Sequence, residues 1–436
     1  MQIASGTVDI TPSNPVPLVG YFLRRGLMKG INDRLEANFF LTKTSKSIIA
    51  IVGLDALFGS NALRDRILSE LGYDSETLTL ILVASHTHFA PGLDRRKPRL
   101  GATDENHLQE IARRIARKIS AELRDSRSKQ VRLSSGRSKC NESTYRRAMA
   151  LRLSKSFPFI KREAVLSPNT KVKHPVDLEL VVAEDVNGEP QMIMWSWPCH
   201  AVSHPNEEMI SADFPGAVRE VLRRHLKRQN LPIIYMPGFA GDIRPYSKRS
   251  ALTLQSFLKY PFSFIPTFKS NTPESFRRLC DGVSNAALDA LRSVGSPVSS
   301  SEPFTVASVH LPLEEIIDGF HVDRKSESAP PTTLPITLVE NDLVSLLFMG
   351  AETCSTYAPY ISRRAQPIDL RTGYSDECFG YLPIDRQISE GGLEGDWFFH
   401  RFSLPGKFKR NIQDLVLSTI HELYDSVSAT RRNRDR

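Results

Sequence analysis

The hydrophobic and polar positions of the chain fall into blocks, and the most distinct block is an apolar run at residues 78–84, LTLILVA. The run is too short to cross a membrane and is apolar on both faces, so it predicts a central strand covered on both sides. It stops at Ser85 and is followed by His86 and His88. Because ligands of open α/β sheets bind beyond the carboxyl ends of such strands, these imidazoles stand where a metal ion or a reaction is expected. His-X-His alone also fits a hydrogen-bonded structural pair.

Further blocks predict the other elements of the fold. Strands are expected at residues 2–9, 36–43, 47–55, 130–136, 177–184, 190–197, 231–236 and 342–352. Helices are expected at residues 61–72, 104–124, 214–229, 273–293 and 405–427. This alternation predicts an α/β fold with a mixed, largely buried β-sheet flanked by helices, substantial parallel content and a metal site at the strand carboxyl ends. We expect residues 137–176 to be a loop-rich middle and residues 321–335 to be a surface excursion.

Composition limits the class of protein. With 40% hydrophobic and 24% charged residues, the 436-residue chain has the make-up of a soluble globular protein with ample material for a core. No stretch approaches the ~18 consecutive apolar residues of a transmembrane helix, and the first residues lack the basic and apolar regions of a secretion signal. We therefore expect a cytoplasmic protein with a single domain over residues 1–436. Five cysteines without a CxxC pair indicate neither a disulfide framework nor a cysteine zinc site.

The net charge of +8 comes largely from basic residues on helix-like segments at 111–124 and 219–230 and in the tail at 431–436. Such faces are typical of solvated surface, and they also favour peripheral contact with an anionic membrane surface. The chain has no recognised nucleic-acid motif and no basic stripe interleaved with aromatic residues. We therefore expect no nucleic-acid partner.

Candidate metal ligands follow two more apolar strands. His200 comes just after the strand QMIMWSW, and Glu352 ends the strand that begins near residue 342. Tyr381 lies in a loop beyond that strand. Two imidazoles and a carboxylate suit Zn²⁺, and an open coordination position for water makes such a site hydrolytic. The spacing alone does not show that these side chains converge, because they lie far apart in the sequence.

Loops near the strand ends carry further polar residues that could serve a site. They are Tyr21, Asp55, Asp213, Asp242 and Arg244. Gly20 precedes the first of these and can bend its loop sharply, because glycine adopts backbone angles that other residues avoid. The apolar segment 251–268 is either a packed loop or a lid over a hydrocarbon portion of a substrate.

Several short motifs, in their order along the chain, resemble those of the neutral/alkaline non-lysosomal ceramidases, zinc-dependent amidases that release the fatty acid from N-acylated sphingoid lipids. The motifs are VDITP at 8–12, Gly20-Tyr21, the stretch 30–37, Asp55, SHTHFAPG at 85–92, WPCHAVSH, ISADFPG, GFAGDIRP, GAET, GYLP and GLEG. The resemblance implies one ceramidase-like catalytic domain, without the immunoglobulin-like domain that follows it in the long ceramidases.

The resemblance also implies the roles of individual residues. The zinc ligands fall on His86, His200, Glu352 and Tyr381. Catalytic roles fall on His88, Arg146 and Asp242, and substrate contacts on Tyr21, Asp55 and Asp213. We also expect a catalytic role for Arg244, in handling substrate or transition-state charge, although this residue departs from the family pattern. Among these, Arg146 matches an arginine that steadies the developing oxyanion. The implied reaction is attack of zinc-bound water on the amide of a small-molecule or lipid-like N-acyl substrate.

The chain departs from the family pattern at two positions. Arg244 stands where the family carries a serine that takes part in the attack, and arginine cannot be a nucleophile because it stays protonated. Its bidentate geometry instead suits an anionic group such as a carboxylate or phosphate. Leu393 stands in place of the tyrosine of a Tyr-Glu-Gly turn. These departures leave two alternatives: a deacylase or esterase for a small polar or anionic substrate, and a non-catalytic binding protein on a hydrolase fold.

Overall fold

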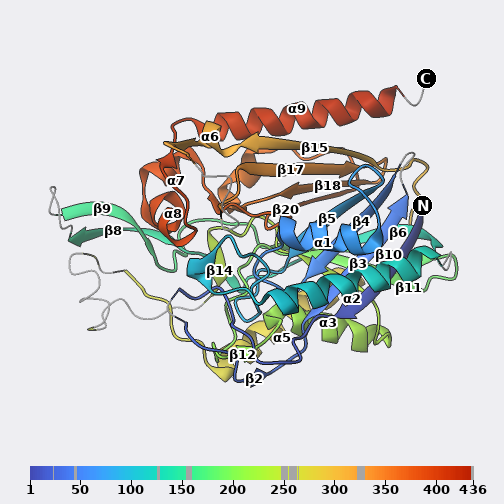
Figure 1. Cartoon of the computed structure of the whole chain (residues 1–436), viewed down its shortest axis with the longest axis horizontal. Coiled ribbons are helices and arrows are strands. Elements are labelled where there is room, and N and C mark those ends of the chain that lie inside the picture. The colour runs from blue at the N-terminus through green and yellow to red at the C-terminus, as the bar shows by residue number, and fades with distance from the viewer. Residues whose placement is uncertain are drawn as a thin grey trace.

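An eight-stranded β-sheet runs through the centre of the protein in the computed structural model, which describes residues 1–22, 24–43, 47–124, 128–153, 160–246, 254, 263, 265–321 and 329–433 (Figure 1). The strand order is β13 (Ile233–Met236), β11 (Pro190–Ser196), β10 (Asp177–Asp185), β6 (Lys129–Lys139), β1 (Gln2–Asp9), β3 (Glu36–Lys43), β4 (Ile48–Leu54) and β5 (Leu78–Ala84). The outermost pair at each edge is parallel, and the pairs between them are antiparallel.

A four-stranded sheet packs on one face of the larger sheet. Its order is β15 (Thr305–Pro312), β17 (Thr333–Glu340), β18 (Val344–Met349) and β20 (Ile368–Thr372). Residues of β4 divide between two cores, because alternate side chains of a strand point to opposite faces. Ile49 and Ile51 pack in one core with Phe348 of the smaller sheet, whereas Ala50 and Val52 pack in another with helical residues. Strands that are apolar at successive positions are therefore buried on both faces.

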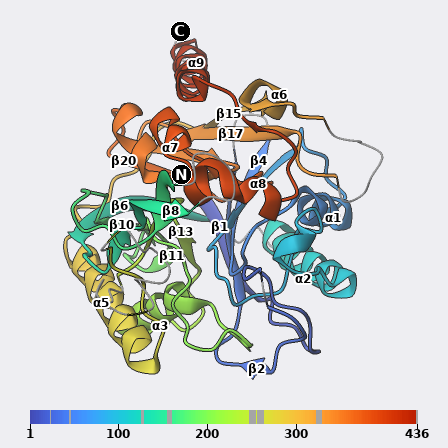
Figure 2. The same ribbon diagram turned by 90° about the vertical axis from the view of Figure 1, so that its left-hand side faces the viewer.

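Five long helices of the described chain cover the outer faces of the two sheets. They are α1 (Asn61–Leu71), α2 (Glu105–Arg124), α3 (Asp213–Leu226), α5 (Pro273–Arg292) and α9 (Ile412–Arg432). Figure 2 shows α1 with α2 and α3 with α5 as two pairs below the sheets, and α9 lies over β15 and β17. The predicted start of α5 is confirmed: Thr272 and Ser275 cap each other's backbone, with Pro273 in the first turn.

Short elements join these layers. Two-stranded ladders form from β2 (Gly30–Ile31) with β12 (Met209–Ile210), β14 (Ile243–Pro245) with β7 (Ser143–Tyr145), β8 (Arg147–Leu153) with β9 (Ile160–Leu166), β16 (Ile317–Asp318) with β22 (Lys407–Phe408), and β19 (Glu352–Thr353) with β21 (Tyr381–Leu382). Short helices are α6 (Leu313–Ile316), α7 (Asp385–Ser389) and α8 (Phe398–Arg401), with single turns at Pro98–Leu100, Ser355–Tyr360 and Leu393–Trp397.

The predicted fold class is confirmed, since a mixed sheet is buried between layers and flanked by helices. The expected parallel content was too high, because most neighbouring strands in both sheets are antiparallel. The loop-rich middle was also wrong, because it contains β7, β8 and β9. β8 and β9 escaped prediction since they are rich in alanine and charged residues, which have low strand propensity, and β7 has only three residues.

Two boundaries also need correction. The last helix is Ile412–Arg432 instead of 405–427, and β17 begins at Thr333, inside the expected surface excursion. Residues 322–328 of that excursion, and most of the apolar segment 251–268, lie outside the described residues. No described helix combines the length and apolar character that crossing a bilayer requires.

Candidate metal centre and active site

Chain segments that follow three buried strands bring the four predicted zinc ligands together. His86 comes two residues after β5, and His200 comes four residues after β11. Glu352 and Tyr381 are direct partners in the parallel ladder of β19 and β21. All four side chains are buried. The structure thus supplies the convergence that the spacing in the sequence could not show.

The ligand atoms are spaced as around a small metal ion. Glu352 Oε2 lies 3.3 Å from His86 Nε2 and 3.2 Å from His200 Nε2. The Tyr381 hydroxyl lies 3.5 Å from His200 Nε2, and His88 Nε2 lies 3.4 Å from His86 Nε2. Tetrahedral coordination with bonds of about 2.0–2.1 Å places neighbouring ligand atoms about 3.3 Å apart. The residues present therefore fit a zinc ion, and His88 lies close enough to join the cluster.

Main-chain carbonyl groups fix the orientation of both ligand imidazoles. His86 Nδ1 lies 2.9 Å from the Leu57 carbonyl oxygen, and His200 Nδ1 lies 2.8 Å from that of Ala240. A carbonyl oxygen only accepts hydrogen bonds, so each Nδ1 carries a proton, and in the neutral form of each ring the Nε2 lone pair is turned toward Glu352. Glu352 Oε2 itself is buried without a hydrogen-bond donor. Three acceptor atoms therefore face one another with no hydrogen between them, which is the arrangement a cation stabilises.

The protonation of the cluster follows from its burial. Burial and the nearby Arg146 guanidinium together lower the pKa of His200 to about 3, so this imidazole is neutral. Burial and the neighbouring His86 likewise hold the pKa of His88 well below its ordinary value. Burial alone would raise the pKa of Glu352, but positive charge on the adjacent His86 and His200 outweighs it and lowers that pKa. Where the rings are neutral, a bound cation would take over this role. Neutral imidazoles and an ionised carboxylate are the states in which these groups bind metals.

The backbone near the ligands is unusually constrained. His86 has a φ of +61°, in the left-handed region that side chains other than glycine rarely adopt. Such strain often occurs at functional sites, where surrounding contacts hold it in place. A Cβ atom on Gly20 would lie 2.6 Å from His88 Nδ1, and one on Gly241 would lie 2.3 Å from the Glu352 carbonyl oxygen. Only glycine at these two positions lets the loops approach the cluster.

Arg146 lies at the junction between β7 and β8, and its side chain reaches the cluster from there. Its Nη1 lies 3.0 Å from His200 Nε2, while its Nε donates to Glu394 Oε1 at 2.7 Å. Glu394 also accepts a hydrogen bond from Arg147, at 2.5 Å. The guanidinium is therefore held rigidly beside the ligand atoms, where a bound ion would compete for the lone pair of His200. Sequence reasoning missed Glu394, although it lies in the glycine-rich turn GLEG.

Asp242 lies close to the cluster, and its carboxylate is already hydrogen-bonded to other residues of the protein. Its carboxylate accepts hydrogen bonds from the Ser355 N–H at 2.7 Å and from Gln387 Nε2 at 2.8 Å. Its carbonyl oxygen accepts from the Arg146 N–H at 2.9 Å. Asp242 thus ties Arg146 to the segment that follows Glu352, and the catalytic role expected of it stays a prediction.

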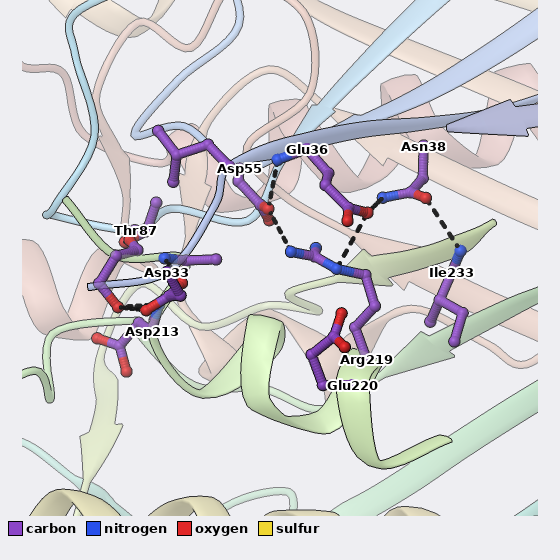
Figure 3. A network of polar contacts seen from close by, with 12 residues as sticks. Asp33, Glu36, Asn38, Asp55, Thr87, Asp213, Arg219, Glu220 and Ile233 are labelled. Carbon is purple, nitrogen blue, oxygen red and sulfur yellow. Dashed lines mark hydrogen bonds and ion pairs between the residues drawn. The ribbon is translucent and has the colours of Figure 1, made fainter. Parts of the chain in front are cut away.

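Asp55 and Asp213 are also engaged within the protein, as Figure 3 shows for the first of them. Asp55 forms a buried ion pair with Arg219 at 2.8 Å and accepts a hydrogen bond from the Glu36 N–H at 2.8 Å. Asp213 is buried and accepts hydrogen bonds from the backbone of Ser203 and of Phe214. These contacts brace α3 against the strand ends. The substrate contacts expected of both residues stay predictions.

Tyr21 lies next to the cluster, with its ring centre 5.2 Å from that of His88. Arg24 stacks on this ring at 4.9 Å and donates a hydrogen bond to the His88 carbonyl oxygen at 2.7 Å. The Tyr374 ring packs against the imidazole of His86, with 4.3 Å between the two ring centres. Tyr21 was predicted as a site residue, whereas Tyr374 was missed because nothing in its sequence context marks it.

Comparison with known proteins agrees with this architecture. No protein-family model and no curated protein sequence matches the chain. The crystal structure of a neutral ceramidase from Pseudomonas aeruginosa superposes with a TM-score of 0.71 at 17% identity, covering 99% of this chain and 74% of that chain. A ceramidase complexed with C2 gives a TM-score of 0.67 at 17% identity, covering 93% of this chain and 72% of that one. The fold is ceramidase-like. At this level of identity the similarity extends to the fold alone.

Proposed function

We propose that the protein is a zinc-dependent hydrolase that cleaves an amide bond in an N-acylated substrate. His86, His200, Glu352 and Tyr381 would hold the ion. The observation that carries the proposal is that His86 Nε2 and His200 Nε2 lie 3.3 Å and 3.2 Å from one buried carboxylate oxygen of Glu352, which has no hydrogen-bond donor among the described residues. The ceramidase-like fold and the motif set support amide hydrolysis as the reaction.

The bound ion would supply Lewis-acid chemistry, polarising the substrate carbonyl and lowering the pKa of a water molecule. Arg146, held by Glu394, lies where its positive charge can stabilise the negative charge that develops on the carbonyl oxygen. His88 presents Nε2 to the cluster, 3.4 Å from His86 Nε2, and this nitrogen would accept a proton from water and return it to the leaving amine. Water is the nucleophile, because Arg244 stays protonated where the ceramidase pattern has a serine.

Zinc analysis together with kinetics tests the proposal. Purified wild type should contain one zinc ion and hydrolyse N-acyl amides. His86→Ala and His200→Ala should lose the zinc and lower kcat/KM by at least about a thousandfold, which corresponds to about 4 kcal/mol. His225→Ala, an exposed histidine on α3, is the matched control and should retain both properties. Wild type without stoichiometric zinc would refute the metal site. Zinc without turnover of a broad amide panel would refute the hydrolase.

A further inference from the structure

Arg244 lies beside the metal-ligand cluster, on the short strand β14. The carbonyl oxygen of the preceding residue, Ile243, accepts a hydrogen bond from the His200 N–H at 3.2 Å. The neighbouring Ala240 carbonyl orients the His200 ring. The same chain segment therefore positions both the metal ligand and the arginine, which fixes one relative to the other. The Arg244 guanidinium also stacks on the Phe268 ring at 4.3 Å, and this contact fixes the plane of the guanidinium.

The other guanidinium groups near the cluster each donate hydrogen bonds within the protein, although Arg24 Nε, Arg146 Nη2 and Arg147 Nε are also buried without an acceptor. Arg146 and Arg147 share Glu394, and Arg24 donates to the carbonyl oxygens of Glu207 and His88. Arg244 has no carboxylate partner in the part of the chain that the structure describes, and its Nε is buried without a hydrogen-bond acceptor. Arg244 is partly exposed, so among the described residues it offers a positive charge and a donor that no carboxylate of the protein uses.

We propose that Arg244 binds a carboxylate group of the substrate, so that the amides cleaved here are carboxylated, as in an N-acylated amino acid. The proposal rests on the proposed function and names its substrate class. A guanidinium binds a carboxylate through two parallel hydrogen bonds. A single unpaired guanidinium balances the one negative charge of a carboxylate, whereas a phosphate monoester carries nearly two at pH 7.

The same geometry disfavours a neutral amide such as ceramide. A neutral substrate would cover Arg244 and leave the guanidinium without an acceptor. Sites built to bind a polar group reject analogues that lack this group, because buried donors are then left unpaired. Arg244 would therefore determine specificity and take no part in breaking the amide bond.

A matched pair of substrates tests this inference. The first is an N-acyl amino acid, and the second is its carboxamide with the same acyl chain. We expect kcat/KM of the zinc-loaded wild type to favour the carboxylate by about 10- to 100-fold. Arg244→Met should bring the ratio close to one, and Arg244→Lys should retain part of it because the charge remains while the bidentate geometry is lost. Arg292→Met, an exposed arginine of α5, is the control and should keep the wild-type ratio.

The outcomes separate this inference from the proposed function. Equal hydrolysis of both substrates by the wild type would overturn the role of Arg244 and leave the hydrolase intact. If the zinc-loaded wild type hydrolyses neither compound, calorimetric titration with the same pair still decides the question. Tighter binding of the carboxylate by wild type than by Arg244→Met supports the inference, and equal binding overturns it.

Discussion

Two buried polar clusters of this protein contain similar residues and differ in one respect. In the bracing cluster, Glu36 and Asp55 face Arg219, which lies 3.2 Å from the first carboxylate and 2.8 Å from the second (Figure 3). In the ligand cluster, Glu352 faces two imidazoles that present lone pairs. In the first cluster an arginine pairs directly with both carboxylates, whereas in the second the nearby cation, Arg146, contacts His200 Nε2 at 3.0 Å and pairs with Glu394. Burial and charge are thus poor guides to a site, whereas the positions of the hydrogens distinguish the two.

The energetics of the two clusters differ accordingly. A buried ion pair roughly balances the cost of removing its charges from water, so the bracing cluster mainly fixes where α3 lies against the strand ends. An ionised carboxylate among neutral imidazoles gains no such balance inside the protein. The free energy of unfolding of the protein should therefore depend on the concentration of a metal ion. Three experiments test the contrast between the two clusters.

The largest effect is expected from Arg219→Met. The substitution leaves the buried Asp55 without its cation, whereas Glu36 keeps Arg223, and breaking a buried pair in this way costs about 3–5 kcal/mol. Urea denaturation should show this loss, while zinc stoichiometry of the folded protein stays at the wild-type value. Arg292→Met, whose ion pair with Asp289 is exposed, should change stability very little. If Arg219→Met folds with unchanged stability, the bracing role is wrong.

Zinc should stabilise the wild type by a similar or slightly smaller amount. A ligand that binds only the folded state stabilises it by about 4 kcal/mol when its free concentration is a thousand times its dissociation constant. Glu352→Gln keeps the shape of the side chain but removes the negative charge, so most of this stabilisation should disappear. Denaturation with and without a chelator measures the difference. Equal zinc dependence in both proteins would exclude Glu352 as a ligand.

Asp376 sharpens the contrast with a third buried carboxylate that lies outside both clusters. Burial raises its pKa from 3.8 to about 6, although it accepts a hydrogen bond from the Leu82 N–H at 3.0 Å. The folded state then binds a proton more tightly than the unfolded state, so stability is lost as the pH rises from about 4 to 7. Two pKa units correspond to about 2.7 kcal/mol.

Asp376→Asn should remove this pH-dependent loss, and asparagine also tolerates the positive φ of 45° at this position. The variant should therefore be more stable than wild type at pH 7 and close to it at pH 4, as measured by chemical denaturation at both values. Asp289→Asn, an exposed acid of α5, should show no such difference. A variant that is less stable at pH 7 would show that burial does not dominate at this carboxylate.

The sequence pointed to the residues that the fold brings together in the ligand cluster because their signal is local, and their role as ligands stays a prediction. His86, His200 and Glu352 each follow an apolar strand, and strand ends of one layered fold come together. Zinc itself stays a prediction, since no metal was tested. The same local reasoning found most strands and helices, because burial on both faces leaves an apolar run that is visible in the sequence.

The partners of these residues could not be predicted in the same way. Arg219 and Arg223 belong to a segment expected to be solvated, yet both are buried against carboxylates of a distant strand. Glu394 lies in a turn with no strand or helix pattern and meets Arg146 only through the tertiary fold. The sequence does not distinguish a charged residue on a solvated face from one in a buried ion pair. The two differ only in whether another element of the fold packs over the residue.

The imidazole rings of the two histidine ligands are oriented by peptide carbonyl groups at Leu57 and Ala240. Every amino acid carries this carbonyl, so replacing either side chain leaves the oriented acceptor in place as long as the loop keeps its course. Substitutions in these loops can therefore accumulate while the two imidazole rings keep their orientation. Main-chain hydrogen bonds of this kind can hold two histidines in the same orientation in proteins whose loop sequences differ greatly.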